Sequence, residues 1–335
     1  MLENRLSYSL LKGLIELQNN TDIVVFNPHS TIELSVEAFE RVSFVQNFFP
    51  TYSTLKKNGL NVSPLITGED KVGASIIYCH RSKTATLGLI ERALFITNPG
   101  GLIIIDGAKT DGINSIFKKM KANFNEVNSF AKFHGKLIWF TTPKDVSKKP
   151  NWATTFKTLP SGHFTHPGLF SAEKIDVGSM LLANSLPELS GYVADFGAGW
   201  GYLSGKILEN SEVKKLDLIE ADYNAIIASQ RNINDSRVEF LWNDVNTFSG
   251  GPYDYVVSNP PFHISRIPDP DIGKEFITRA KKLLKPSGAV FIVANRNLPY
   301  EGVMRDNFQI VDQIVAEDGF KVLYGRKPKN STVQL

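Results

Sequence analysis

The sequence predicts an α/β protein with two tandem domains, each a mostly parallel sheet covered by helices. Three observations lead to this fold class. The chain has 335 residues, a length that corresponds to about two domains of ordinary size. Hydrophobic residues make up 42% and charged residues 21%, as in folded globular proteins. A strand–helix–strand pattern occurs once in each half, and such units build parallel sheets.

The repeated pattern starts with an apolar run that ends in polar residues. A helical stretch follows, and the two helical stretches align without gaps at Ile, Arg, Ala and Pro. A β-branched run bounded by Pro-Gly or Pro-Ser-Gly comes next and is typical of a buried strand. The strand-like runs are 74–80, 254–260, 101–106 and 288–293, and the helical stretches are 90–99 and 277–286. One fold used twice explains this repeat.

The boundary between the two copies is expected near 145–165. The segment Lys148-Lys-Pro-Asn and the segment Leu159-Pro-Ser-Gly162 break any regular periodicity there. We therefore predict one domain over 1–155 and a second over 160–335.

Composition excludes several classes of protein. No run of about 18 apolar residues could span a bilayer, and the first residues lack the basic-then-apolar pattern of a secretory signal. The single cysteine, Cys79, cannot form an intramolecular disulfide, and the six histidines are scattered. We expect a cytoplasmic protein without a membrane segment and without a metal.

Charge is distributed unevenly between the two halves. The net charge of +3 is too small to indicate nucleic-acid binding by itself. Residues 1–160 hold 19 Lys and Arg against 13 Asp and Glu, whereas residues 161–335 hold 18 against 21. The first half could hold a polyanion, although ordinary solvated surface lysines would give the same count.

A glycine-rich loop in the second half is the first chemical signal. A short apolar strand ends at Asp195-Phe, and glycines follow at 197, 199 and 201 before a helix. Glycines let the backbone approach a ligand closely beneath a helix N-terminus. A dinucleotide fingerprint would place its third glycine at 202, where Tyr202 stands. The spacing instead resembles the loop of class I S-adenosylmethionine-dependent methyltransferases, with a plain tight turn as the alternative.

Acidic residues follow the next two expected strands. Glu220 ends the strand 216–220, about 20 residues after the loop, where a carboxylate can accept hydrogen bonds from both ribose hydroxyls. Asp222, in the following turn, is the competing candidate. Asp244 follows the strand 238–242, a place where such folds meet the adenine amine, although it could also cap a turn.

The segment 258–263, Ser-Asn-Pro-Pro-Phe-His, is the most specific feature of the chain. An amino group conjugated to a ring is a poor nucleophile because its lone pair is delocalised. The side-chain oxygen of Asn259 and the backbone carbonyl of Pro260 can accept its two N–H bonds and hold its nitrogen in line with a methyl donor. Pro261 stiffens the turn, and Phe262 can stack on a flipped base. The role of His263 stays open.

Two other chemistries lack the residues that they need. Methylation of a pyrimidine C5 requires a cysteine nucleophile, and Cys79 lies in the other half of the chain. A metal-dependent enzyme requires clustered ligands. The closest histidine pair, His163 and His166, lies in a Gly- and Pro-rich stretch.

Residues 164–327 resemble the catalytic domain of the ribosomal RNA small-subunit methyltransferase C family, which are guanine-N2 methyltransferases. The resemblance rests on five stretches in order: Gly168-Leu-Phe-Ser with Ile175-Asp-Val-Gly-Ser, Asp195-Phe-Gly-Ala-Gly-Trp-Gly, Ser258-Asn-Pro-Pro-Phe-His, Val293-Ala-Asn-Arg-Asn-Leu-Pro-Tyr300 and Phe320-Lys-Val-Leu. It implies two tandem Rossmann-like class I methyltransferase domains, the N-terminal one degenerate and suited to RNA binding or support. Accordingly, Tyr78-Cys-His-Arg81 replaces the Asn-Pro-Pro-Phe segment in the first half.

The resemblance also assigns roles to residues. It implies that the methionine part of S-adenosylmethionine is surrounded by Asp195, Gly197, Gly199 and Gly201, that Glu220 binds ribose and Asp244 adenine, that Asn259 to Phe262 hold the target guanine, and that Phe170 and Asp176 line the pocket. The implied partner is rRNA or the small ribosomal subunit. Three alternatives stay open: the same chemistry on large-subunit rRNA, N-methylation of adenine N6 or a protein glutamine, and a non-enzymatic RNA-binding protein.

Overall fold

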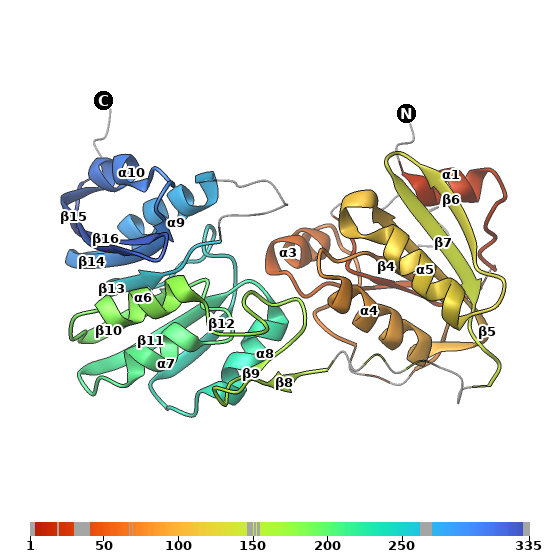
Figure 1. The fold of residues 1–335 in the computed structure, drawn as a ribbon, viewed down its shortest axis with the longest axis horizontal. Coiled ribbons are helices and arrows are strands. Elements are labelled where there is room, and N and C mark those ends of the chain that lie inside the picture. Colours follow the sequence, from red (N-terminus) through yellow and green to blue (C-terminus); the bar gives the residue numbers. More distant parts are fainter. Residues whose placement is uncertain are drawn as a thin grey trace. The chain divides into compact units, whose positions relative to one another are not determined.

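The computed structural model describes residues 4–18, 20–29, 41–66, 68, 70–145, 150, 152, 155–261 and 270–330. The chain divides into two compact units, Met1–Phe156 and Lys157–Leu335. Each unit contains a seven-stranded mixed sheet with helices on both faces (Figure 1). The predicted fold class, two tandem α/β domains, is confirmed.

The sheet of the N-terminal unit has the strand order β3-β2-β1-β4-β5-β7-β6. Its strands are β1 (Ile23–Phe26), β2 (Val42–Val45), β3 (Val62–Ser63), β4 (Val72–Tyr78), β5 (Thr97–Ala108), β6 (Asn128–Lys132) and β7 (Gly135–Thr141). The five strands from β1 to β5 run parallel, and β7 and β6 complete an antiparallel edge. Its helices are α1 (Arg5–Leu11), α3 (Phe49–Lys57), α4 (Lys83–Ile96) and α5 (Ile113–Asn123), with a 3₁₀ turn at Lys109–Asp111.

The sheet of the C-terminal unit repeats this topology as β12-β11-β10-β13-β14-β16-β15. Its strands are β10 (Gly191–Phe196), β11 (Val213–Glu220), β12 (Val238–Trp242), β13 (Tyr253–Ser258), β14 (Leu284–Asn295), β15 (Phe308–Glu317) and β16 (Phe320–Pro328). Its helices are α6 (Val177–Ser185), α7 (Tyr202–Leu208), α8 (Tyr223–Asn232), α9 (Pro270–Leu283) and α10 (Tyr300–Asn307). A small hairpin, β8 (Lys157–Thr158) and β9 (Phe164–Thr165), precedes them.

Two apolar layers enclose the C-terminal sheet. Helices α6, α7 and α8 pack on one face around buried residues such as Leu182 and Val257, and α9 and α10 pack on the other around Phe276 and Val256. Successive residues of a strand point to opposite faces, so the continuous apolar run of β13 serves both layers. The sheet is therefore buried on both sides over most of its area.

The predicted helical stretches 90–99 and 277–286 extend too far. Helix α4 ends at Ile96 and α9 ends at Leu283, and a strand starts at the next residue in both units. The prolines at 99 and 286 explain this difference, because the residue before a proline avoids the helical conformation.

The N-terminal unit has lost the glycine loop. No glycine occurs between Gly13 and Gly59, so the segment after β1 starts with Asn27-Pro-His instead. Pairing of Phe26 with Val45, as of Phe196 with Ile219, places Gln46 at the position of Glu220. The amide of Gln46 donates to the Pro28 carbonyl, 2.9 Å away, and accepts from the Phe48 N–H. The predicted degeneracy of this copy is confirmed by these replacements.

Candidate active site

The candidate residues gather at the carboxyl edge of the C-terminal sheet. Strand β10 pairs with β11 on one side and with β13 on the other, and the chain order reverses between β10 and β13. Phe196 lies opposite Ser258 in this register. The glycine loop and the Asn-Pro-Pro segment therefore leave neighbouring strands at the same edge, the switch point where open α/β sheets bind ligands.

Glycine geometry shows why the loop needs these residues. Gly197, Gly199 and Gly201 have φ angles of 70°, 57° and 90°, which favour glycine strongly. A Cβ placed on Gly201 would come within 2.8 Å of Ile233, so this glycine packs the loop against α8. A Cβ on Gly199 would meet nothing within 4 Å. The loop thus presents an open backbone surface at Gly199.

The loop also lies beside the Asn-Pro-Pro segment. A Cβ on Gly197 would come 3.2 Å from the Phe276 ring and 3.9 Å from Pro261 Cδ. The structure therefore brings together two motifs that are about 60 residues apart in the sequence.

Glu220 lies at the end of β11 and is tied to the loop. Its Oε2 accepts from the Gly199 N–H at 2.7 Å, and its Oε1 accepts from the Asp222 N–H at 2.8 Å. Removal from water raises the pKa of this carboxyl, and the backbone donors offset part of the effect. Asp222 instead caps α8 by accepting from the Asn224 N–H at 2.8 Å. Of the two ribose candidates, Glu220 is the one bonded to the glycine loop.

Asp195 is completely buried at the end of β10. Its Oδ2 accepts from the Ser204 hydroxyl at 2.7 Å, whereas its Oδ1 has no hydrogen-bond partner among the described residues. Burial raises the pKa of this carboxyl to about 7, and the nearby charge of Glu220 acts in the same direction. A buried carboxylate oxygen without a partner is costly unless a ligand supplies a donor or a positive charge.

Asp244 follows β12, whose last residue Trp242 pairs with Glu220. Its Oδ1 accepts from the Asn246 N–H at 2.9 Å, so the side chain does cap the turn, as the alternative interpretation anticipated. The turn holds the carboxyl at the same edge as Glu220, and Oδ1 and Oδ2 both keep lone pairs for a ligand.

Asn259 is held by two residues from α6. Its Nδ2 donates to Asp176 Oδ2 at 2.9 Å and to Ser179 Oγ at 2.8 Å. Asp176 also caps α6, because the same Oδ2 accepts from the Ser179 N–H at 2.7 Å. Sequence reasoning placed Asp176 along the pocket but missed Ser179, because a serine three residues after a helix cap carries no distinct sequence signal.

For the remaining predicted residues, the structure gives burial or no description at all. Pro260 is buried and Pro261 is exposed, whereas Phe262 and His263 lie outside the described residues. Phe170 is 58% exposed, so its place in the pocket stays a prediction.

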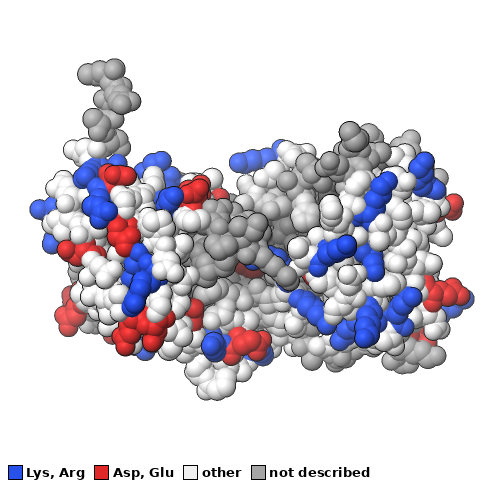
Figure 2. All heavy atoms as spheres, turned by 45° about the horizontal axis from the view of Figure 1, so that its top comes forward, with Lys and Arg blue, Asp and Glu red and all other residues white. Residues whose placement is uncertain are grey.

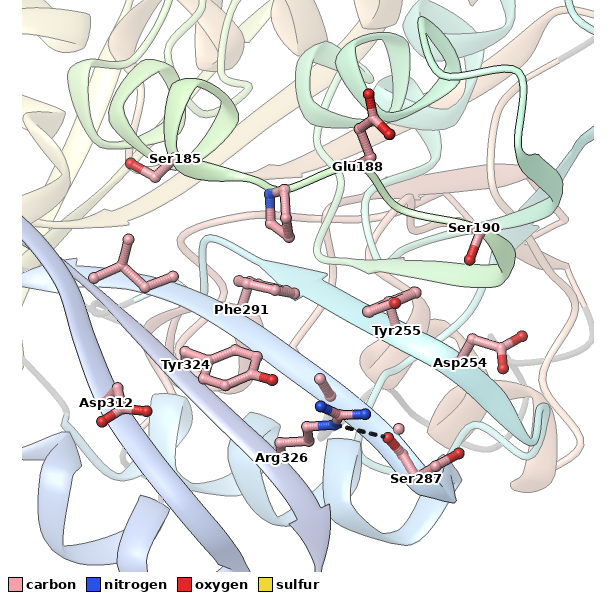
Figure 3. Close-up of a pocket in the computed structure, with 14 residues that line it drawn as sticks. Ser185, Glu188, Ser190, Asp254, Tyr255, Ser287, Phe291, Asp312, Tyr324 and Arg326 are labelled. Atoms are coloured by element: carbon pink, nitrogen blue, oxygen red, sulfur yellow. Dashed lines mark hydrogen bonds between the residues drawn. The ribbon is translucent and has the colours of Figure 1, made fainter.

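A cavity of about 580 Å³ lies away from this edge. Figure 3 shows Tyr255, Phe291 and Tyr324 along its floor, with Asp254 near one end. Asp254 lies at the start of β13, and the cavity therefore faces the opposite end of the strand from Asn259. It takes no part in the site described above.

The chain is similar to several known proteins. Residues 162–324 match the methyltransferase small domain family. The chain is 28% identical over 323 residues to the ribosomal RNA small subunit methyltransferase C of Psychromonas ingrahamii, covering 91% of this chain and 92% of that protein. It is 27% identical over 268 residues to the protein of the same name from Shewanella amazonensis, covering 77% of this chain and 79% of that protein.

The chain resembles the ribosomal RNA small subunit methyltransferase C family along most of its length. A solved member of this family is a T. thermophilus 16S rRNA N2 methyltransferase in complex with AdoMet and guanosine. Its fold matches with a TM-score of 0.78 at 20% identity, covering 96% of this chain and 91% of that one. Both domains of this methyltransferase C fold are therefore present in the chain.

Among the described residues, no group of three or more His, Cys, Asp or Glu side chains could hold a metal ion. Within the same part of the chain, no helix is both long and apolar enough to cross a bilayer.

Proposed function

We propose that this protein transfers the methyl group of S-adenosylmethionine to the exocyclic N2 of a guanine in small-subunit rRNA, in the cytoplasm. The observation that carries the proposal is the geometry of Asn259. Both hydrogens of its amide nitrogen are engaged by Asp176 and Ser179, so its oxygen is left as an acceptor beside the glycine loop. An acceptor at that place suits an amino group that must face a methyl donor.

The carboxyl edge fits S-adenosylmethionine. Gly199 offers open backbone, and Asp195 Oδ1 is a buried acceptor that no described residue contacts by a hydrogen bond, which suits the positively charged methionine part. We propose that Asp195, Gly197, Gly199 and Gly201 hold that part. Glu220 would bind the ribose and Asp244 the adenine, with Phe170 and Asp176 along the pocket. When bound, the cofactor supplies an electrophilic methyl group on sulfur.

The chain's own residues then prepare the acceptor nitrogen. The Asn259 side-chain oxygen and the Pro260 backbone carbonyl would accept the two N–H bonds of the amino group. These bonds fix the direction of the nitrogen lone pair and stabilise the positive charge that develops on nitrogen as it forms the new bond to carbon. Phe262 would stack on the guanine, which must leave its helix or stack to reach the site.

The N-terminal unit would hold the surrounding rRNA. Two of its lysines lie close together, because the ammonium groups of Lys121 on α5 and Lys136 on β7 lie 4.9 Å and 4.2 Å from the centre of the same Phe117 ring. Figure 2 shows Lys and Arg outnumbering Asp and Glu on the visible face of this unit, whereas the C-terminal unit mixes both signs. Such a surface suits phosphate groups.

The test is methyl transfer from labelled S-adenosylmethionine to small and large ribosomal subunits and to their naked rRNAs. Nucleoside mass spectrometry identifies the product. N2-methylguanosine in small-subunit material is expected. If N2-methylguanosine forms only in large-subunit RNA, the proposed target in small-subunit rRNA is wrong. If label appears in adenosine or in protein, the proposed acceptor, guanine N2, is wrong.

Asn259→Ala serves as the matched variant in this assay. We expect turnover to fall about 100- to 1,000-fold, as for other groups that stabilise transition-state charge. Binding of S-adenosylmethionine, measured by calorimetry, should stay within about twofold, because Asn259 is assigned to the acceptor. Near-native turnover in this variant would contradict the role given to Asn259.

A further inference from the structure

The amide of Asn259 is oriented by two groups at the N-terminal end of α6. Asp176 Oδ2 and Ser179 Oγ lie 2.9 Å and 2.8 Å from Asn259 Nδ2. These two contacts use both hydrogens of the amide nitrogen. They span 83 and 80 residues of sequence, from the N-terminal end of α6 to the end of β13.

A carboxylate selects one of the two orientations of an amide. It accepts hydrogen bonds only, so a flipped Asn259 would place its oxygen against Asp176 Oδ2 in a repulsive contact. In the observed orientation the oxygen of Asn259 is directed away from α6. We propose that Asp176 and Ser179 are positioning residues that present the Asn259 oxygen to the amino group of the acceptor base. This inference rests on the proposed function, and it gives Asp176 a different task from the pocket contact expected from sequence.

The N-terminal unit supplies an internal comparison. Asn4 caps α1 there, as Asp176 caps α6, and Ser7 lies three residues later, as Ser179 does. Pairing of Phe26 with Ile77, as of Phe196 with Ser258, places Tyr78 at the position of Asn259. Asn4 and Tyr78 line one cavity of about 240 Å³, so the cap meets the strand end in both units.

This comparison separates capping from positioning. Asparagine, aspartate and serine cap helices about equally well, and α1 forms with an asparagine cap. The helix itself does not require the negative charge of Asp176. The carboxylate occurs in the unit whose strand end carries an amide, and the unit with a tyrosine there lacks it.

The test uses the full-length protein with three variants. Asp176→Ser keeps a capping hydroxyl but is too short to reach Asn259 as well. Ser179→Ala keeps the backbone N–H that Asp176 caps. We expect each to lower kcat about 10- to 100-fold, while calorimetric affinity for S-adenosylmethionine and the melting temperature change little. Asp176→Asn, whose neutral oxygen can still accept from Nδ2, should recover part of the rate.

Two controls make the result specific. Ser185→Ala removes a hydroxyl that donates to the Leu181 carbonyl at the other end of α6, and it should leave kcat unchanged. In the Asn259→Ala background, Asp176→Ser should cause no further loss, because a positioning residue acts only through the residue that it positions.

Each alternative outcome contradicts the inference in a different way. Reduced cofactor affinity with kcat restored at saturation would make Asp176 a cofactor contact. Additive losses in the double variant would make its role independent of Asn259, and unchanged kcat in both single variants would remove the role. A wild-type protein that transfers no methyl group to guanine would overturn the proposed function as well, which the wild-type control shows separately.

Discussion

At the scale of the residue, the burial of Asp195 changes the pH at which its carboxyl ionises. The side chain is fully buried, one oxygen has no partner in the part of the chain that the structure describes, and burial raises the pKa of its carboxyl to about 7. Between the ordinary pKa of 3.8 and this raised pKa, the Asp195 carboxyl of the folded protein therefore keeps a proton that the same carboxyl has lost in the unfolded chain. For such a group, stability is highest below the ordinary pKa of 3.8 and is lost as pH rises toward about 7.

This residue gives a prediction about pH. Asp195→Asn keeps an acceptor for Ser204 and cannot ionise, so its free energy of unfolding should gain on that of the wild type as pH rises. The gain should be at most about 1.4 kcal/mol per pH unit and should level off above about pH 7. Urea unfolding of both proteins without ligand, from pH 5 to pH 8, measures it. Parallel stability curves would contradict the assignment.

At the scale of the element, the glycine loop combines two different demands on the backbone. Gly201 is packed against Ile233, whereas Gly199 faces open space, and both have positive φ. Alanine at Gly199 should cost only about 1–2 kcal/mol of folding stability, the ordinary cost of a left-handed residue. Its methyl group would nevertheless occupy the surface proposed for the cofactor.

The pair Gly199→Ala and Gly201→Ala separates binding from folding. We expect Gly199→Ala to fold and to lose most of its affinity for S-adenosylmethionine. Gly201→Ala should unfold at clearly lower urea, because the added carbon meets Ile233 as well as carrying the strained φ. Calorimetry and urea unfolding together measure the two effects, and equal affinity in Gly199→Ala and wild type would exclude the loop as the cofactor surface.

The elements also show how far sequence reasoning reaches. The buried strands could be predicted because β-branched runs such as 288–293 are bounded by Pro and Gly, and the order of motifs along the chain indicated one common sheet edge. The helix ends were predicted less accurately, because a proline ends a helix at residues that precede the proline itself. The contact of Asp176 with Asn259 could not be predicted, because no local periodicity relates side chains on α6 and β13.

At the scale of the whole molecule, the two copies of one fold differ in charge. Residues 1–160 carry an excess of Lys and Arg, and residues 161–335 an excess of Asp and Glu. The carboxylates of the C-terminal unit suit a cationic cofactor, and the lysines of the N-terminal unit suit phosphates. Under the proposed function, one duplicated fold would serve two ligands of opposite charge, with the chemistry in only one copy.

This division predicts a salt dependence. Neutralised phosphates release counterions, so affinity for rRNA should fall steeply with salt. A plot of log K against log salt concentration should have a negative slope, of magnitude about 0.7–0.9 for each phosphate contact. Affinity for S-adenosylmethionine should change little. The double variant Lys121→Gln with Lys136→Gln removes the two ammonium groups that share the Phe117 ring. We expect its slope for rRNA to be smaller by about 1.5. Filter binding at several salt concentrations measures the slope.

A matched variant tests whether the position of the charge matters. Lys214→Gln with Lys282→Gln removes the same total charge from the C-terminal unit, where both residues are exposed. Its slope should stay close to that of the wild type, because these lysines lie outside the proposed rRNA surface. If both double variants reduce the slope equally, net charge alone controls binding, and the N-terminal unit is not the rRNA-holding surface.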